Sequence, residues 1–228
     1  MSILRSALQA LSLPIYRSRR IAQAIFPISF FPTGPKDYYF DITTVVLVQR
    51  VAPRIHKNDH LLDLGTGAHA VVGLSLWKRI GCRVTCSDIN PDLVDLAAKN
   101  IAENRAPLEV IHSRLFADVT AAFNVVVFNP PYVPADQAVG SRLAKLRRTQ
   151  FDGGDDGMRV IREFLDDLAN RSVPTCAYMG INRLCVPSER ILALIRDHSS
   201  LSLIEFLPSR VLQCDVYVIS NRRSIDHP

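Results

Sequence analysis

The run Asn129-Pro130-Pro131-Tyr132 carries the most specific chemistry in the sequence. It follows the apolar run 125–128, which predicts a buried strand whose carboxyl end lies where open α/β folds bind ligands. The side-chain oxygen of Asn129 and the carbonyl oxygen of Pro130 can accept two hydrogen bonds from a planar nitrogen, and proline stiffens the loop. The ring of Tyr132 can stack on a flat amide or base. The loop therefore predicts a grip on an amide or exocyclic amine, which positions a poor nucleophile without a strong base.

A glycine-rich turn follows an earlier apolar run. Gly65 and Gly67 stand between a predicted buried strand and a predicted helix. Glycine lets the chain turn tightly and lets a ligand approach the backbone. Asp63, two residues before the first glycine, is placed to meet a cationic amino group or ordered water; alternatively, it only bonds the backbone of the turn. The turn therefore predicts a ligand site beside the first strand.

A second acid, Asp88, ends the next apolar run, where a carboxylate can accept hydrogen bonds from both hydroxyls of a ribose. The spacing from Gly65 through Gly67 to Ala70 also fits the loose fingerprint of a nicotinamide dinucleotide site. Asp63 favours S-adenosylmethionine instead, because the amino-acid end and the sulfonium of that molecule both benefit from nearby acceptors. A dinucleotide site has no general need for a charge at this position.

From residue 60 onward, short apolar runs alternate with helical segments, which predicts an α/β fold. The predicted strands are 60–64, 83–87, 108–112, 124–128, 174–179, 202–206 and 211–219. The predicted helices are 70–80, 91–104, 157–169 and 188–197. We therefore expect a Rossmann-like, seven-stranded, mostly parallel sheet with helices on both faces and a closing hairpin.

Residues 1–55 precede this pattern and are predicted to form a helical N-terminal extension, while residues 56–228 form the catalytic domain. The part up to residue 26 reads as one or two short helices, and four helix breakers make 27–40 an irregular connector. Asp41 is predicted to cap a helix that ends before Pro53. The three aromatic residues 38–40 serve either as a lid over the pocket or in the packing of the extension.

Composition predicts a cytoplasmic protein. The five cysteines lack C-x-x-C spacing, which argues against a disulfide framework and a zinc cage, and no metal site is expected. No apolar run approaches the roughly 18 residues that span a bilayer. Arg17, Arg19 and Arg20 follow the apolar start of the chain where a cleaved signal would have small residues. The net charge of +5 is mild.

A basic segment lies between the tetrapeptide and the next predicted helix. It could guide RNA or an acidic partner, but a solvated helix face is the favoured interpretation. Nucleic acid is therefore a partner that the sequence allows without favouring. The basic residues of the segment are Arg142, Lys145, Arg147 and Arg148.

These motifs together resemble the class I S-adenosylmethionine-dependent methyltransferases, in which an acid precedes a glycine-rich turn and a second acid follows the next strand. The resemblance covers roughly residues 60–219 and implies S-adenosylmethionine as the cofactor. It implies a catalytic role for Asn129, Pro130 and Tyr132. The implied cofactor-binding residues are Asp63, Gly65, Thr66, Gly67, Asp88, Ile89, Leu115 and Asn129.

The tetrapeptide and the glycine-acid run 151–162 resemble the release-factor glutamine methyltransferases more narrowly. Two positions depart from that group: Arg114 stands where an acid usually precedes a Leu-Phe pair, and Asn124 replaces the aspartate that usually opens the strand before the tetrapeptide. His69 departs from the broader class I family, in which a third glycine is common at this place. The N-terminal portion is also short and basic. The cofactor and the grip on nitrogen are therefore expected to persist while the substrate has changed.

The leading hypothesis is methyl transfer to an amide or amine nitrogen, with a protein glutamine or a small molecule as the acceptor and no membrane partner. An alternative is an enzyme of specialised metabolism. It would be a small-molecule methyltransferase, or it would cyclise S-adenosylmethionine itself to azetidine-2-carboxylate and release methylthioadenosine. A third reading is a binding subunit without activity.

Overall fold

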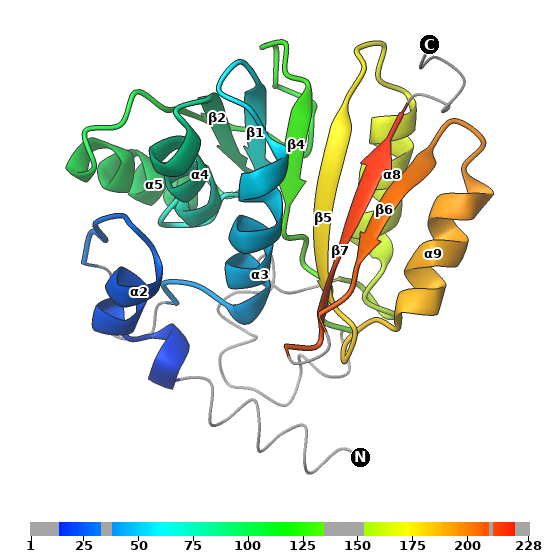
Figure 1. Cartoon of the computed structure of the whole chain (residues 1–228), viewed down its shortest axis with the longest axis horizontal. Coiled ribbons are helices and arrows are strands. Elements are labelled where there is room, and N and C mark those ends of the chain that lie inside the picture. Colours follow the sequence, from blue (N-terminus) through cyan, green and yellow to red (C-terminus); the bar gives the residue numbers. More distant parts are fainter. Residues whose placement is uncertain (1–13, 33–37, 135–152, 210–211, 222–228) are drawn as a thin grey trace.

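A computed structural model describes residues 14–32, 38–134, 153–209 and 212–221. One seven-stranded sheet forms its centre, in the order β3-β2-β1-β4-β5-β7-β6 (Figure 1). The strands are β1 (His60–Leu64), β2 (Arg83–Asp88), β3 (Glu109–His112), β4 (Val125–Phe128), β5 (Cys176–Asn182), β6 (Ser202–Leu207) and β7 (Cys214–Ser220).

The first five strands are parallel to one another, and β7 lies antiparallel between β5 and β6. This arrangement confirms the predicted Rossmann-like, mostly parallel sheet with a closing hairpin. The chain steps outward from β1 to β3 and then returns to place β4 on the other side of β1. The carboxyl ends of β1, β2 and β4 consequently meet at one edge, which is the switch point where such folds bind ligands.

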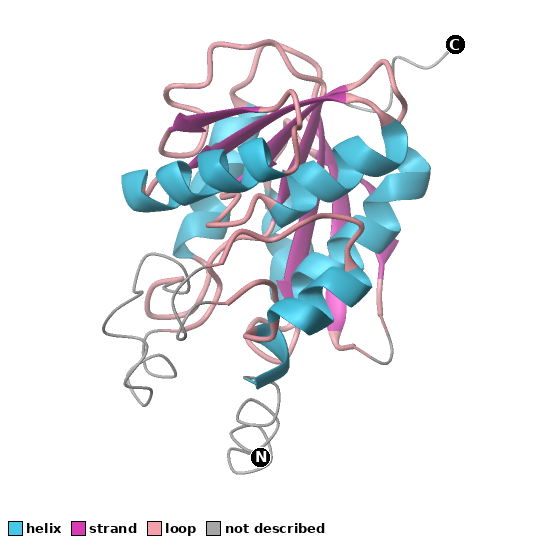
Figure 2. Ribbon diagram, turned by 90° about the vertical axis from the view of Figure 1, so that its left-hand side faces the viewer, coloured by secondary structure: helices cyan, strands magenta, loops and turns pink. Residues whose placement is uncertain are grey.

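Helices cover both faces of the sheet (Figures 1 and 2). Alternation along β1 shows the two layers, because Leu61 packs into one buried cluster and Leu62 into the other. The first cluster includes residues of α3 (Ile42–Val51), α4 (Val71–Ile80) and α5 (Pro91–Glu103). The second includes residues of α8 (Arg159–Ala169) and α9 (Ser188–Asp197).

Element boundaries differ from the sequence predictions by a few residues, for local reasons. Helix α8 begins at Arg159 rather than at Gly157, because Gly157 has a φ of 75° and cannot take a helical conformation there. Strand β5 continues to Asn182 because its far end pairs with Cys214 at the start of β7. The cap at Asp41 is as predicted: its carboxylate accepts a hydrogen bond from the Thr44 amide.

The described part of the N-terminal extension packs into the same core as the sheet. Besides α3, it contains the short helix α2 (Arg19–Ile25), and its aromatic side chains join the first buried cluster: Phe26, Phe30, Tyr39 and Phe40. Tyr39 and Phe40 are thus packing residues. Of the helices in the described residues, none is long and apolar enough to span a membrane.

Asn100 of α5 and Asn104, which caps the end of this helix, tie the connector to the domain. Asn100 accepts a hydrogen bond from the Phe31 amide at 2.5 Å, and its own amide donates to the carbonyl of His69 at 2.7 Å. Asn104 bonds both the amide and the carbonyl of Ser29, at 2.7 and 2.9 Å. The connector is therefore fixed by specific polar contacts as well as by burial.

Candidate active site

The predicted site residues meet at the carboxyl edge of the sheet. Leu64, the last residue of β1, pairs with Ser87 of β2 on one side and with Phe128 of β4 on the other. The residues that follow these positions are the glycine turn, Asp88 and Asn129. The structure therefore brings both predicted halves of the site together.

The glycine turn adopts a conformation that suits glycine. Gly65 and Gly67 both have a φ of 66°, and the Thr66 amide donates to the carbonyl of Ser87 at 2.8 Å. A Cβ atom placed on Gly65 would approach the ring of Phe128 to 3.2 Å. One placed on Gly67 would meet no atom within 4 Å. The turn thus packs against the protein at its first glycine and borders open space at its second.

Asp63 is buried beneath the turn. One carboxylate oxygen accepts hydrogen bonds from the Thr66 hydroxyl at 2.5 Å and from the Gly73 amide at 2.8 Å. Burial raises the pKa of this carboxyl to about 6. These bonds fasten the turn to α4, which agrees with the alternative that Asp63 serves the turn itself. Contact with a cofactor amino group stays a prediction.

Asp88 joins the turn to the second strand. Its Oδ2 atom accepts a hydrogen bond from the Gly67 amide at 2.9 Å, and its Oδ1 atom accepts one from the Asn90 amide at 2.9 Å. Each carboxylate oxygen has a second acceptor position, so the group retains capacity for ribose hydroxyls. Burial raises its pKa. The adjoining Ile89 is 47% exposed, which is unusual for isoleucine and leaves an apolar surface beside the acid.

Leu115 lies after β3 on the same edge. It is buried and has a φ of 49°, a conformation that the Ser113 hydroxyl supports by donating to the Leu115 carbonyl at 3.0 Å. Its side chain joins the second buried cluster. Its predicted contact with the cofactor stays a prediction.

Asn129 is held by the N-terminal extension. Its Nδ2 atom donates to the two carboxylate oxygens of Asp41 at 3.2 and 3.1 Å and lies 3.4 Å from the Thr44 hydroxyl. Its Oδ1 atom is buried and has no hydrogen-bond partner among the described residues. The amide therefore has its donor side occupied and its acceptor side unused.

The other two residues of the predicted grip are buried. Pro130 follows Asn129 in the loop, and Tyr132 is 8% exposed. The Tyr132 hydroxyl shares a 2.7 Å hydrogen bond with the hydroxyl of Thr43, which in turn lies 3.4 Å from the Cys214 sulfur. Burial raises the pKa of Tyr132 well above its ordinary value, so the phenol is neutral. Stacking of this ring on an acceptor stays a prediction.

Asp41 and Thr43 are site residues that the sequence analysis did not identify. Asp41 is predicted only as a helix cap, and 88 residues separate it from Asn129. An acid at the start of the helix before the glycine turn is the only signal present in the sequence. The acid can be assigned to the site only once the structure shows that α3 lies against β5 and β7.

Two of the departures from the glutamine methyltransferase pattern form polar contacts with other parts of the chain. The Arg114 guanidinium pairs with Glu163 of α8 at 2.8 Å, in an exposed position. Asn124 lies at the opposite end of β4, where its amide donates to Asp59 at 2.7 Å and its oxygen accepts from the His60 amide at 2.9 Å. An aspartate at position 124 would face the Asp59 carboxylate, so the asparagine suits its neighbour.

The third departure, His69, is packed between the extension and the glycine turn. Its ring stacks on Tyr39 with centroids 4.7 Å apart and meets the edge of Phe30. Burial lowers the pKa of His69 to about 4, so the ring is neutral near pH 7. The residue that replaces a glycine of the turn therefore docks the extension.

The glycine-acid run is described from residue 153 onward. Asp156 accepts hydrogen bonds from Arg162 of α8 and Arg190 of α9, which lower the pKa of this carboxyl to about 2. The run thus joins two helices on the second face of the sheet. The basic segment with Arg142, Lys145, Arg147 and Arg148 lies outside the described residues.

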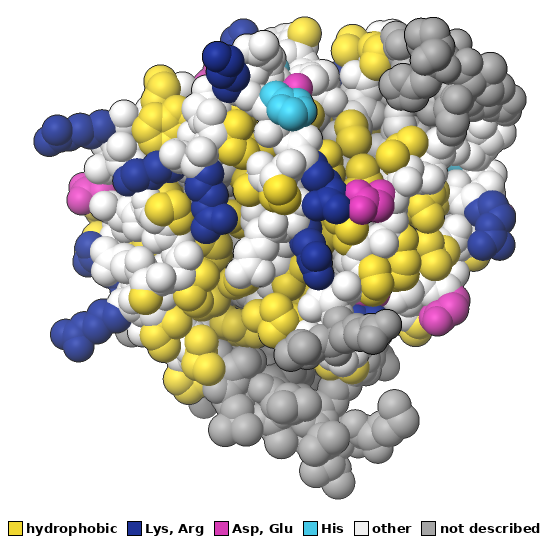
Figure 3. Space-filling view, viewed as in Figure 1, with side chains coloured by type: hydrophobic (Ala, Val, Ile, Leu, Met, Phe, Trp, Pro, Cys, Tyr) yellow, Lys and Arg dark blue, Asp and Glu magenta, His cyan; other side chains and the backbone are white. Residues whose placement is uncertain are grey.

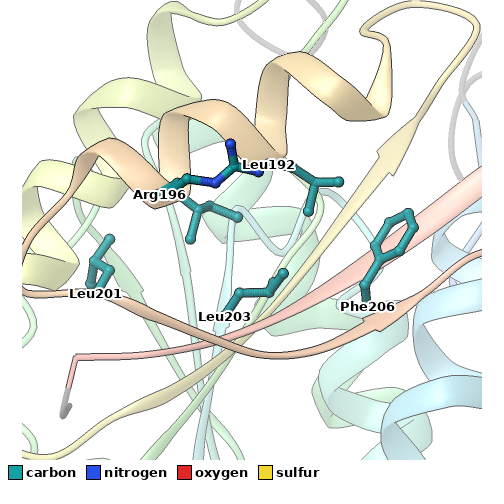
Figure 4. A pocket seen from close by; sticks show the side chains of 6 residues that line it. Leu192, Arg196, Leu201, Leu203 and Phe206 are labelled. Carbon is teal, nitrogen blue, oxygen red and sulfur yellow. The ribbon is translucent and has the colours of Figure 1, made fainter. Parts of the chain in front are cut away.

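A cavity of ≈ 460 Å³ lies elsewhere, between α9 and β6 (Figure 4). Leu192 and Arg196 line it from the helix, and Leu203 and Phe206 line it from the strand. The groove contains none of the predicted site residues. This cavity therefore does not mark the candidate active site, which stands out by its polar groups at the carboxyl edge.

Comparison with known proteins identifies the class. The chain belongs to the methyltransferase small domain family, whose model matches residues 37–161, more than half of the 228 residues. Together with the fold, this match confirms the predicted class I methyltransferase type and, for that class, S-adenosylmethionine as the cofactor. Some of the matched solved structures hold that molecule.

The relatives include glutamine methyltransferases. A Methanocaldococcus jannaschii protein provisionally named a protein N5-glutamine methyltransferase is 34% identical over 116 residues, which are 50% of this chain and 56% of the relative. A release factor glutamine methyltransferase of Lactococcus lactis is 35% identical over 95 residues, which are 41% and 35% of the two chains. The chain thus spans roughly a third to a half of the length of these relatives. Others are named as ribosomal RNA methyltransferases.

The solved structures support the fold. A methyltransferase from Pyrococcus furiosus superposes with a TM-score of 0.67 at 16% identity. The match covers 93% of this chain and 97% of that one. The likeness therefore extends across nearly the whole architecture, including the part that precedes the glycine turn.

Proposed function

We propose that this chain transfers a methyl group from S-adenosylmethionine to an amide or amine nitrogen held by Asn129 and Pro130. The observation that carries the proposal is the Oδ1 atom of Asn129, which is buried and without a partner among the described residues. A buried acceptor that lacks a donor costs roughly 1 to 3 kcal/mol, so in proteins such an atom usually has a partner, which a ligand or a water molecule can supply. An N–H donor is the complement that this atom requires.

The residues around the turn fit S-adenosylmethionine. Open space beside Gly67 admits a ligand against the backbone, the carboxylate of Asp88 retains acceptor capacity for a ribose, and exposed Ile89 offers an apolar surface for a base. Thr66, Asp63 and Leu115 complete the proposed surroundings. When bound, the cofactor supplies an electrophilic methyl group on a positively charged sulfur.

The protein contributes position rather than a strong base. The Oδ1 atom of Asn129 and the carbonyl of Pro130 would accept the two N–H bonds of the acceptor, and this fixes the lone pair of its nitrogen towards the methyl group. Tyr132 is buried at the end of the loop as a neutral phenol. Methyl transfer makes the nitrogen more acidic, so its proton can leave to water after the new bond has formed.

A glutamine side chain of a protein is the acceptor that we favour. The relatives named above act on glutamine by their names, and a primary amide presents the two N–H bonds that the loop accepts. A small amide or amine has the same chemistry. Nucleic acid is less favoured, because the net charge of +5 is mild and the basic side chains of the described residues are spread over several parts of the face shown in Figure 3.

A second candidate is self-reaction of S-adenosylmethionine, and the burial of Tyr132 favours it. The hydroxyl of this residue is engaged by Thr43, so the ring belongs to the wall instead of lying open to a large acceptor. In this reaction the α-amino nitrogen of the methionine part attacks its own γ-carbon. The carbon–sulfur bond breaks, azetidine-2-carboxylate forms with loss of a proton from nitrogen, and methylthioadenosine leaves.

One experiment separates these functions. Purified protein is incubated with S-adenosylmethionine alone and with a synthetic peptide that carries one central glutamine, and the nucleoside products are identified. Adenosylhomocysteine and a methylated peptide, formed only together, would support transfer. Methylthioadenosine without any acceptor would support self-reaction. Neither nucleoside, despite binding of the cofactor, would overturn both and leave a binding role.

We also propose that residues 1–55 act as an extension that completes the catalytic domain of residues 56–228. The hydrogen bond from Asn129 to Asp41 supports a joint site. All five cysteines are free thiols, which supports a reducing compartment such as the cytoplasm. Measuring the thiol content of protein purified from its host without reductant would test the second proposal.

A further inference from the structure

We propose that Asp41 is a positioning residue for the reaction, which it serves by fixing the orientation of the Asn129 amide. The inference rests on the proposed function at Asn129 and extends it to a residue of the N-terminal extension. The evidence is the pair of hydrogen bonds from Asn129 Nδ2 to the Asp41 carboxylate, at 3.2 and 3.1 Å.

The orientation follows from the chemistry of the partners. The two ends of an asparagine amide have nearly the same shape, so only the hydrogen-bond network decides which end faces which neighbour. An ionised carboxylate is an acceptor only, and it therefore binds the NH₂ end. This places Oδ1 of Asn129 on the opposite side, where it is buried and unpaired among the described residues. The carboxylate thus selects the acceptor end of Asn129 for the substrate.

Several contacts fix the position of Asp41. Its Oδ1 atom accepts hydrogen bonds from the amide and the hydroxyl of Thr44, at 2.7 and 2.9 Å. Helix α3, which Asp41 caps, lies close against the sheet: a Cβ atom on Gly180 of β5 would approach Leu47 and Thr43 to 2.8 Å. A rigid helix start therefore holds the carboxylate, and the carboxylate holds the amide.

The charge of Asp41 also suits the reaction. The carboxylate contacts the side chain that is proposed to hold the acceptor beside a positively charged sulfur. A negative group at this place attracts cationic or N–H-rich ligands and disfavours anionic acceptors. Asp41 would therefore help to select a neutral amide or amine over a carboxylate of similar shape.

Asp41→Asn tests the orientation directly. The remaining oxygen can keep the cap on the Thr44 amide and its 3.2 Å contact with Asn129 Nδ2, but an NH₂ group replaces the oxygen that lies 3.1 Å from the same nitrogen. Two donors cannot bond each other, whereas the new NH₂ group can donate to Asn129 Oδ1, so Asn129 is expected to turn over and point the atom that should hold the substrate towards position 41. We expect kcat to fall about 100-fold, while the dissociation constant of S-adenosylmethionine changes less than about 3-fold.

Asp41→Ser serves as the matched variant. A serine also caps a helix well, so α3 keeps its start. Its hydroxyl neither reaches Asn129 nor opposes it, and we expect a smaller loss in kcat, about 10-fold. Ser18→Ala is the control, because it removes the cap of α2 in the same extension without touching Asn129. It is expected to leave kcat unchanged.

Nuclear magnetic resonance provides a readout that does not need turnover. In the wild-type protein, the side-chain NH₂ protons of Asn129 should show a nuclear Overhauser effect to the side chain of Thr44, since Nδ2 lies 3.4 Å from its hydroxyl oxygen. Asp41→Asn should abolish this effect, and Ser18→Ala should keep it. Equal kcat values for Asp41→Asn and the wild type, or an unchanged effect in that variant, would overturn the positioning role.

The two proposals can fail separately. If the wild-type protein forms neither nucleoside product with the glutamine peptide or with S-adenosylmethionine alone, the proposed function fails. The resonance experiment then still decides whether Asp41 orients Asn129. If products form and Asp41→Asn forms them at the wild-type rate, only the inference about Asp41 fails.

Discussion

The glycine turn and the reactive loop lie side by side but are held in different ways. Within the turn, the polar partners lie at most 21 residues away in the chain, as in the bonds of Asp63 to Thr66 and Gly73 and of Asp88 to Gly67. In the loop, Asn129 depends on Asp41, 88 residues away in the chain. The proposed cofactor site at the turn is therefore held by contacts between neighbouring elements, whereas the proposed reactive loop depends on a distant one.

Removing the side chain of Asn129 should have the largest effect. Asn129→Ala deletes the acceptor atom but leaves the glycine turn intact, so we expect kcat to fall at least about 1000-fold with nearly unchanged cofactor affinity. Product formation measures the first quantity and calorimetry with S-adenosylmethionine the second. A wild-type rate would remove Asn129 from the mechanism and with it the contrast between the two regions.

The two glycines of the turn should respond differently to alanine. Gly67→Ala places a methyl group in the open space beside the turn, and we expect the affinity for S-adenosylmethionine to fall at least about 10-fold, with about 1 kcal/mol of strain from its φ of 66°. Gly65→Ala presses on Phe128 and should cost more stability, about 2 kcal/mol. Calorimetry measures the affinity of both variants for S-adenosylmethionine, and urea unfolding measures their stability. Unchanged affinity in Gly67→Ala would contradict a ligand at this place.

The docking of the extension should depend on pH through His69. Its pKa of about 4 in the folded chain lies below the ordinary 6.5, so the unfolded chain binds more protons between these values. Stability from this residue is complete above pH 6.5 and is lost as the pH falls towards 4, by about 3 kcal/mol at 1.36 kcal/mol per pKa unit. Urea unfolding at pH 4.5 and 7.5 measures the change.

Asp63 changes the stability with pH in the direction opposite to His69, so a His69 variant is needed to measure the contribution of His69 by itself. Its pKa of about 6 in the folded chain exceeds the ordinary 3.8, so its contribution to stability decreases as the pH rises from 3.8 to 6. The difference between wild type and His69→Asn should still grow from pH 4.5 to 7.5. A constant difference would show that His69 is not buried as a neutral ring.

The smallest effect is expected on the second face of the sheet. Asp156→Asn removes the charge that pairs with Arg162 and Arg190. These groups are partly exposed, so the loss should be about 0.5 to 1 kcal/mol near pH 7. It should vanish as the pH falls from 3.8 towards 2, because the wild-type carboxyl then also becomes neutral. Exposed Asp155→Asn is the control, and an equal loss in both variants would contradict the pairing.

The sequence predicts the framework well because its signals are local. Apolar runs locate all seven strands to within a few residues, and the cap at Asp41 is correct. The glycine turn and Asp88 are found from spacing alone, because adjacent parallel strands must end at the same edge. The family match then agrees with the class that these motifs indicate.

The contacts between distant segments could not be predicted in the same way. Nothing near Asp41 states that its carboxylate meets Asn129, and nothing near His69 states that Tyr39 stacks on it. The hydrogen bond from Asn124 to Asp59 could not be predicted either, because it depends on β1 and β4 being neighbours in the sheet. Such contacts depend on packing, which a periodic pattern does not encode.

The bond between Asp41 and Asn129 also joins an early part of the chain to one that is synthesised much later. Translation completes Asp41 first, and its partner follows 88 residues later, after β1, β2 and β3 have been made. Until β4 takes its place beside β1, the asparagine amide has no carboxylate to orient it. The residues of the proposed cofactor site are thus synthesised before those that are proposed to hold an acceptor.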